Sequence, residues 1–395
     1  MRPTLSICAT VLGLGLALCA AAPAPPEKPG QRDTPVTPPA KRFEREVLRL
    51  SGPGPVTALS FAPGGRALAA AHGKSVILWD LPTRKQVHRW QVPGTWTWVS
   101  AISFSPDGRT IAAAGGGGAR AAREDDPPAL LWDARTGKLV RGLGDPRETC
   151  RSIAFSPDGK TIAFGGMRLL GFDAATGKLL WNAYPPKKLI PGKVQSEPAA
   201  NVWHLAWSPD GRTFAAVSSP NVLTLWTAHG KRLAEVNGQR VQRAPVGGLA
   251  FAPDGKTLAW RQPDRSVRLV EPRTGRTLRQ LPPPKDAGEA DPSAIYCAAF
   301  SPDGALLASA ERDTGSGLLV LYDVPTGKEV HRVTDKEYRI EWIAFSPDGK
   351  LLAVGGVDST VHLLGPLAPT PLELLDKKDP SPGLLDRKKS PGEKE

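Results

Sequence analysis

The sequence predicts an all-β protein, a seven-bladed β-propeller with four-stranded antiparallel blades, and three observations lead to this prediction. A pentad made of an aromatic residue, Ser or Ala, Pro, Asp or Gly, and Gly recurs seven times, at spacings of 43 to 52 residues. Each pentad separates two short apolar stretches, and a third apolar stretch and a more polar fourth one follow it. The chain contains 41 Gly and 41 Pro, which suits short strands joined by turns. Four short strands per repeat are typical of a propeller blade.

At the N-terminus, residues 1–22 have the pattern of a secretory signal peptide. Arg2 precedes an apolar run from Leu5 to Leu18, and small residues follow. One alternative is a retained membrane anchor, because the stretch is nearly long enough to span a bilayer. Another is a lipoprotein signal with a lipid on Cys19, although Leu18 stands where such signals have Gly, Ala or Ser. We expect export to the periplasm, the cell envelope or the medium, with no membrane span in the mature form.

Two further segments flank the predicted propeller, which covers residues 43–366. Residues 23–42 form a Pro-rich linker, since seven Pro stand among small and charged residues there. Residues 367–395 are rich in Pro and Lys, and their charges nearly cancel. We expect this segment to be a disordered, solvated tail.

Turn chemistry explains the pentads. Pro fixes φ at the first central position of a tight turn, Asp tolerates the second position, and Gly supplies the left-handed residue that follows. Each pentad therefore predicts a hairpin between the first two strands of its unit. A third strand follows and ends at pairs such as Trp79-Asp80 and Trp132-Asp133. A turn then leads into the fourth strand. The seven pentads begin at Phe61, Phe104, Phe155, Trp207, Phe251, Phe300 and Phe345.

The two ends of the repeat array predict a closed ring. The last unit has three strands before Pro366, and residues 43–50 have the pattern of the missing fourth strand. We expect this N-terminal strand to complete the seventh blade, which removes an open sheet edge. The residue before each pentad aromatic is small in all seven units, as a narrow central channel requires. These residues are Ser60, Ser103, Ala154, Ala206, Ala250, Ala299 and Ala344.

The paired FSPDG and Trp-Asp landmarks resemble the WD40-repeat family, and more narrowly exported WD-repeat proteins of bacterial type. The resemblance covers residues 43–366 and implies a propeller that serves as an interaction scaffold. Family members often carry a Gly-His pair and an Asp that join a buried hydrogen-bonded network. No Gly-His pair occurs at the expected places, and only Asp264 and Asp358 match the Asp position. We therefore expect these blades to depend mainly on apolar packing.

Insertions point to one end of the propeller as the binding surface. They fall at 115–128, 184–201, 282–294 and 311–317, in second-to-third turns and in inter-blade connections, which lie at the same end. Trp, Tyr and Arg are enriched at interface hot spots. An alternative for Trp96 and Trp203 is a packing role between blades, and the insertions could lack a role altogether. The candidate binding residues are Trp96, Trp98, Arg151, Trp203, Tyr296 and Glu341.

These patterns predict a non-catalytic scaffold for protein–protein interaction, monomeric, with a protein partner and no cofactor. The six His are scattered without metal-ligand spacing, and no basic run with interleaved aromatics indicates nucleic acid. The alternative is a propeller enzyme or a glycan-binding lectin with a pocket at the channel mouth, where Glu341 would be the carboxylate. Residues 173–181 resemble the repeat of quinone-dependent dehydrogenases, but that pattern occurs once. Cys150 and Cys297 fall in separate units, so we expect both thiols to be free.

Overall fold

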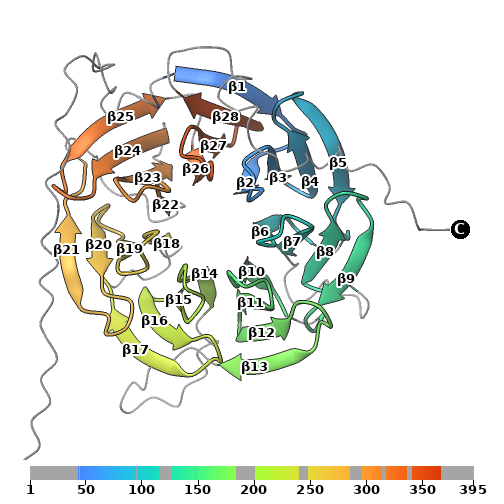
Figure 1. Cartoon of the computed structure of the whole chain (residues 1–395), viewed down its shortest axis with the longest axis horizontal. Helices are drawn as coiled ribbons and strands as arrows, with labels where there is room; N and C mark the ends of the chain where they lie inside the picture. Colours follow the sequence, from blue (N-terminus) through green and yellow to red (C-terminus); the bar gives the residue numbers. More distant parts are fainter. Residues whose placement is uncertain are drawn as a thin grey trace, which may run out of the picture. The chain divides into compact units, whose positions relative to one another are not determined.

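The computed structural model describes residues 43, 45–94, 96–115, 126–146, 148–183, 201–239, 248–284, 296–312, 317–335 and 340–365. Within these residues the regular structure is 28 β-strands in seven four-stranded antiparallel sheets (Figure 1). The sheets stand around a central axis as blades, which confirms the predicted fold class. The predicted signal segment 1–22, the linker 23–42 and the tail 367–395 lie outside the described residues.

The strands follow the chain from the innermost to the outermost position of each blade. Blade 1 consists of β2 (Val56–Phe61), β3 (Ala67–His72), β4 (Ser75–Asp80) and β5 (Lys85–Gln91). Blade 2 consists of β6 (Val99–Phe104), β7 (Thr110–Gly115), β8 (Ala129–Asp133) and β9 (Leu139–Leu143). Blade 3 consists of β10 (Cys150–Phe155), β11 (Thr161–Gly166), β12 (Leu169–Asp173) and β13 (Leu179–Ala183). Blade 4 consists of β14 (Val202–Trp207), β15 (Thr213–Ser218), β16 (Val222–Thr227) and β17 (Arg232–Asn237).

The remaining blades continue the same order. Blade 5 consists of β18 (Leu249–Phe251), β19 (Leu258–Arg261), β20 (Val267–Val270) and β21 (Thr277–Leu281). Blade 6 consists of β22 (Tyr296–Phe300), β23 (Leu306–Arg312), β24 (Gly317–Asp323) and β25 (Glu329–Asp335). Blade 7 consists of β26 (Ile340–Phe345), β27 (Leu352–Gly356), β28 (Thr360–Gly365) and the N-terminal strand β1 (Arg45–Ser51).

The N-terminal strand closes the ring, as predicted. β1 pairs antiparallel with β28, so that Arg45 lies opposite Gly365 and Ser51 lies opposite Thr360. A second contact joins the hairpins of the first and last blades. Pro347 Cδ lies 3.6 Å from the position that a Cβ on Gly65 would occupy. Strand pairing and hairpin packing therefore both hold blade 7 against blade 1 (Figure 1).

A buried histidine adds a hydrogen-bonded link at this closure. His362 of β28 is 1% exposed. Its Nδ1 lies 2.7 Å from Glu46 Oε2 of β1, and its Nε2 lies 2.7 Å from Asp358 Oδ2 in the turn before β28. Asp358 was one of two residues matching the Asp position of the family. Blade 7 thus contains a partly buried polar network centred on a histidine of the third strand of the blade.

The hydrophobic core consists of seven clusters, and each cluster lies between two neighbouring blades. One of them joins Leu363 of blade 7 to Val56 of blade 1. Every blade therefore buries both of its faces, which explains why the second and third strands are nearly continuous apolar runs. The residues expected in the core are buried, except that Trp79 is only partly so: Trp132, Trp226 and Tyr322 are 4%, 4% and 1% exposed.

The predicted hairpins are present. A hydrogen bond between the Ser and Asp side chains, which the sequence did not predict, stabilises them in most blades. In blade 3, Ser156 Oγ donates to Asp158 Oδ1 at 2.6 Å and accepts the Thr161 N–H at 2.9 Å. Gly159 has φ of 71°, the left-handed conformation expected. Hydrogen bonds from Ser156 and from the Lys160 N–H lower the pKa of the Asp158 carboxyl. The same Ser–Asp bond occurs in four other blades, from Ser105, Ser208, Ser301 and Ser346.

The ring of small residues occupies the innermost strands, around the axis (Figure 1). All seven are partly exposed, and in blades 1 to 3 their sequence neighbours on both sides are buried. Two of them also bind the next blade, because Ser60 Oγ accepts the Phe104 N–H at 3.2 Å and Ser103 Oγ accepts the Phe155 N–H at 3.3 Å. Small side chains at this register let the innermost strands approach each other closely.

Candidate interaction surface

The end of the channel opposite the hairpins carries a repeated irregularity in the first strands. In five blades the second residue of the first strand has no partner in the ladder, which is the signature of a β-bulge. A bulge re-aims the side chain of the extra residue. Three predicted binding residues stand at these bulges, and so the structure gathers them around one mouth. The bulged residues are Thr57, Ser100, Arg151, Trp203 and Glu341.

The bulged side chains link each blade to the next one. Thr57 Oγ1 donates to Val99 O at 2.6 Å, and Ser100 Oγ donates to Cys150 O at 2.7 Å. In the following blade, the guanidinium of Arg151 lies over the Trp203 ring, 4.2 Å from its centroid. Blades 1 to 4 are therefore connected in series at the mouth, first by hydroxyl groups and then by a cation–π contact.

The Arg151–Trp203 pair combines a charged group and a large ring in a fixed arrangement. Trp203 Nε1 donates to Ser219 Oγ at 2.7 Å, which holds the indole in place. Both side chains are half-buried. Burial lowers the pKa of Arg151, yet an arginine remains charged at neutral pH. A cation–π contact of this kind contributes about 0.5–2 kcal/mol, depending on its exposure.

A second aromatic pair spans the channel itself. His204 of β14 stacks on Trp342 of β26, with ring centroids 5.7 Å apart and an interplanar angle of 17°. These strands belong to blades 4 and 7, which face each other across the ring (Figure 1). Burial lowers the pKa of His204 to about 4, so the imidazole is neutral at pH 7. Neither His204 nor Trp342 was among the binding residues predicted from the sequence. Both residues are the third residue of a first strand, where three other blades have the small residues Ala58, Ala101 and Ser152. Two large rings at this position were the feature of the sequence that could have indicated the pair.

The two tryptophans predicted before blade 2 have different environments. Trp96 is 1% exposed, lies in the core cluster between blades 1 and 2, and donates from Nε1 to Pro127 O at 3.1 Å. Trp96 therefore packs between two blades, which was the alternative to a binding role. Trp98 is 48% exposed, the largest exposed aromatic side chain in the part of the chain that the structure describes. Only Trp98 of this pair is accessible to a partner.

Glu341 is buried near two other polar residues. It is 6% exposed, and its charge acts on the Cys297 thiol together with that of Arg261. Arg261 is 1% exposed and donates from Nη1 to Ser309 Oγ at 3.1 Å. Glu341 thus belongs to an internal polar group between blades 5, 6 and 7. The side chain of Tyr296, the last predicted residue, lies outside the described residues.

Cys150 and Cys297 are free, as predicted, and both are buried. Burial raises the pKa of Cys297 to about 12 and that of Cys150 well above its usual value. In the residues that the structure describes, no group of three or more His, Cys, Asp or Glu could hold a metal ion. The same residues include no helix with the length and apolar character needed to cross a membrane.

The long connections singled out by the sequence join strands at the mouth end. Segment 115–128 runs from β7 to β8, 184–201 from β13 to β14, 282–294 from β21 to β22, and 311–317 from β23 to β24. Most of their residues lie outside the described part of the chain. The surface described here is therefore built from the strand ends and short turns between them.

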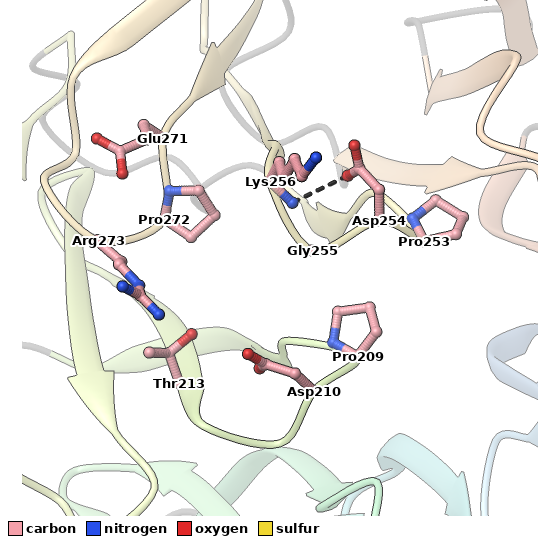
Figure 2. A pocket seen from close by; sticks show the side chains of 10 residues that line it. All are labelled: Pro209, Asp210, Thr213, Pro253, Asp254, Gly255, Lys256, Glu271, Pro272 and Arg273. Atoms are coloured by element: carbon pink, nitrogen blue, oxygen red, sulfur yellow. Dashed lines mark hydrogen bonds between the residues drawn. The ribbon is translucent and has the colours of Figure 1, made fainter. Parts of the chain in front are cut away.

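At the opposite end, a cavity of about 630 Å³ opens between blades 4 and 5 (Figure 2). Its walls are the repeat's own turns, and their carboxylates are engaged within those turns. Asp254 Oδ1 accepts the Lys256 N–H at 2.9 Å, and Asp210 Oδ1 accepts Ser208 Oγ at 2.6 Å. The cavity is therefore a product of hairpin geometry. Its lining is Pro209, Asp210, Thr213, Pro253, Asp254, Gly255, Lys256, Glu271, Pro272 and Arg273.

Comparison with known proteins agrees with this architecture. The family model WD40, described as WD domain, G-beta repeat, matches residues 44–80, 85–120, 191–227, 287–323 and 327–363. The segment 44–80 contains β1 and the first three strands of blade 1, so the sequence repeat is offset from the blade by one strand. The segment 327–363 likewise joins the last strand of blade 6 to blade 7.

Several curated relatives carry the same repeats. The "WD repeat-containing protein SL1-17" of Schistosoma mansoni is 30% identical over 39% of this chain and 46% of its own length. The chain thus spans less than half of that relative. The "Guanine nucleotide-binding protein subunit beta" of Solanum tuberosum is 25% identical, and that of Arabidopsis thaliana 26%, each over 78% of this chain and 80% of the relative. With seven blades, five matched repeats and these relatives, the chain belongs to the WD40-repeat family.

Proposed function

We propose that the chain is a non-catalytic scaffold that binds a protein partner through the mouth end of its propeller. The observation that carries the proposal is the fixed Arg151–Trp203 pair at the mouth. Trp and Arg are the residues most often found at hot spots, and a ring held by its own hydrogen bond loses little conformational entropy on binding. Trp98, which leads into blade 2 at the same end, adds exposed aromatic area.

Two further points support a scaffold over a pocket enzyme or lectin. The carboxylate on which those alternatives depended, Glu341, is buried among other polar groups. The relatives from Solanum tuberosum and Arabidopsis thaliana are named as subunits, which supports a role within an assembly. We also propose that the protein is exported, on the pattern of residues 1–22. Cell fractionation and N-terminal sequencing of the purified protein test the export.

The binding proposal is tested by comparing two exposed positions at opposite ends of the propeller. A partner is first captured from cell-envelope extract, and its affinity is then measured by biolayer interferometry. We expect Trp98→Ala to weaken binding at least tenfold, as truncation of a hot-spot aromatic does. Leu139→Ala is the matched control, because Leu139 is 58% exposed and starts a fourth strand at the hairpin end. Equal affinities of the two variants would refute the assignment of this surface.

A further inference from the structure

The connections at the hairpin end of the propeller carry a larger net positive charge than the connections at the mouth end. Its connections are the turns between the first and second and between the third and fourth strands of each blade. They contain fourteen basic and seven acidic residues, whereas the connections at the mouth end contain fourteen and thirteen. Including the strand ends at the hairpin end still leaves seventeen basic against twelve acidic residues. The connections at the two ends therefore differ in net charge, because those at the hairpin end contain fewer acidic residues.

The carboxylates at this end accept hydrogen bonds from groups within their own turns. Asp133 Oδ1, for example, accepts the N–H and the hydroxyl of Thr136 at 2.6 and 2.7 Å, and Asp210 accepts the hydroxyl of Ser208. Arg109 lies 3.9 Å from Asp107 and Lys350 lies 3.8 Å from Asp348, and twelve of the fourteen basic residues are exposed. A long Lys or Arg side chain extends beyond a turn-bound Asp, so an approaching surface meets positive charge first.

Exposed aliphatic residues border this basic surface. Of the nine exposed large hydrophobic residues in the described chain, seven stand in the first two residues of fourth strands, directly beside the hairpin end. Two of them follow a turn lysine immediately, in Lys138-Leu139 and Lys178-Leu179. The seven are Leu139, Val140, Leu179, Leu180, Leu233, Leu278 and Val330. Basic residues interleaved with exposed Leu are the composition that binds a membrane interface.

The shape and the chain path agree with a membrane as the partner. All thirteen connections at this end have four to six residues, so no long loop projects from the surface. Arg45 and Gly365 pair at the hairpin end of β1 and β28, and so the chain both enters and leaves the propeller there.

We propose that the hairpin end docks on an anionic phospholipid bilayer, with lysine and arginine side chains at the headgroups and the aliphatic border at the interface. Each basic residue near an anionic surface contributes about 1 kcal/mol, and the attraction weakens as salt is added. This surface is separate from the mouth, so a protein partner can bind there while the propeller lies on the membrane.

The test is flotation of the full chain with vesicles of phosphatidylcholine alone and of phosphatidylcholine with one-third phosphatidylglycerol. The hairpin variant combines Lys160→Glu, Arg212→Glu and Lys256→Glu. The matched control reverses the same number of charges in the connection between β13 and β14, with Lys187→Glu, Lys188→Glu and Lys193→Glu. All three residues of the hairpin variant are exposed, and we expect melting temperatures of both variants to remain close to that of the parent.

The expected result is partition that rises with phosphatidylglycerol, falls between 50 and 500 mM salt, and drops at least about tenfold in the hairpin variant but less than about twofold in the control. Equal losses in both variants would show that only net charge matters and would overturn the proposal. Equal binding to both kinds of vesicle would assign the contact to residues 1–22 instead. Replacement of Leu139 and Leu179 by Ser should also reduce partition. If that change alters the mass in light scattering without vesicles, the border joins two copies and the membrane assignment fails.

Discussion

Truncation of Trp96 should destabilise the protein, whereas truncation of Trp98, only two residues away, should leave its stability nearly unchanged. Trp96 is 1% exposed and fills the space between blades 1 and 2, where its ring lies so close to Gly115 that a Cβ on this glycine would collide with it. Trp96→Ala should lower the free energy of unfolding by about 3–5 kcal/mol, as expected for a buried Trp. Loss of the bond to Pro127 O adds about 1 kcal/mol if no other donor replaces it. Trp98→Ala should change it by no more than about 0.5 kcal/mol.

Urea denaturation followed by far-UV circular dichroism measures the difference. With a slope of about 3 kcal/mol per molar, Trp96→Ala should move the midpoint down by about 1 M or more, and Trp98→Ala should leave it within the error. Partner affinity should respond in the reverse order when it is measured well below either midpoint. A shift of the same size in both variants would contradict the burial of Trp96 between the blades.

Three further outcomes follow from other features. Ser156→Ala should lower the free energy of unfolding by about 1–3 kcal/mol, because the buried hydroxyl no longer donates to Asp158 or accepts the Thr161 N–H. Differential scanning calorimetry measures this loss, with the exposed substitution Thr136→Ala for comparison. His204 has a folded pKa of about 4, below its unfolded value, so its contribution to stability should decline as the pH falls from 6.5 towards 4. Urea midpoints of the parent and of His204→Gln across that range measure this, and parallel curves would contradict it. Cys150 and Cys297 should resist alkylation in the native protein and react in urea, as peptide mass mapping would show.

The parts of this fold that follow from local chemistry could be predicted from the sequence. The pentads specify hairpins because Pro and Gly each have one suitable place in a tight turn, and Gly159 adopts the expected φ of 71°. The missing fourth strand of the last unit could be inferred from counting, since an unpaired sheet edge needs a partner. The pairing of Arg45 with Gly365 confirms that inference.

Features that depend on the arrangement of separate blades could not be predicted in the same way. The His204–Trp342 stack exists because blades 4 and 7 face each other across a narrow channel, and no single repeat contains that distance. Trp96 and Trp98 stand in an irregular connection, where no strand or helix periodicity indicates which side chain turns inward. The sequence shows that Ser recurs at the position of Ser156 in most pentads, but this recurrence does not indicate which atoms the hydroxyl binds.

The pairing of the first strand with the last blade has a consequence for synthesis. Arg45–Ser51 is among the first segments to leave the ribosome, and its partner Thr360–Gly365 is among the last. During translation and any transport step, this strand cannot pair until more than three hundred further residues have been synthesised. The growing chain meanwhile has two open edges, and truncated products lacking the final strand keep them, which makes such fragments targets for aggregation or proteolysis.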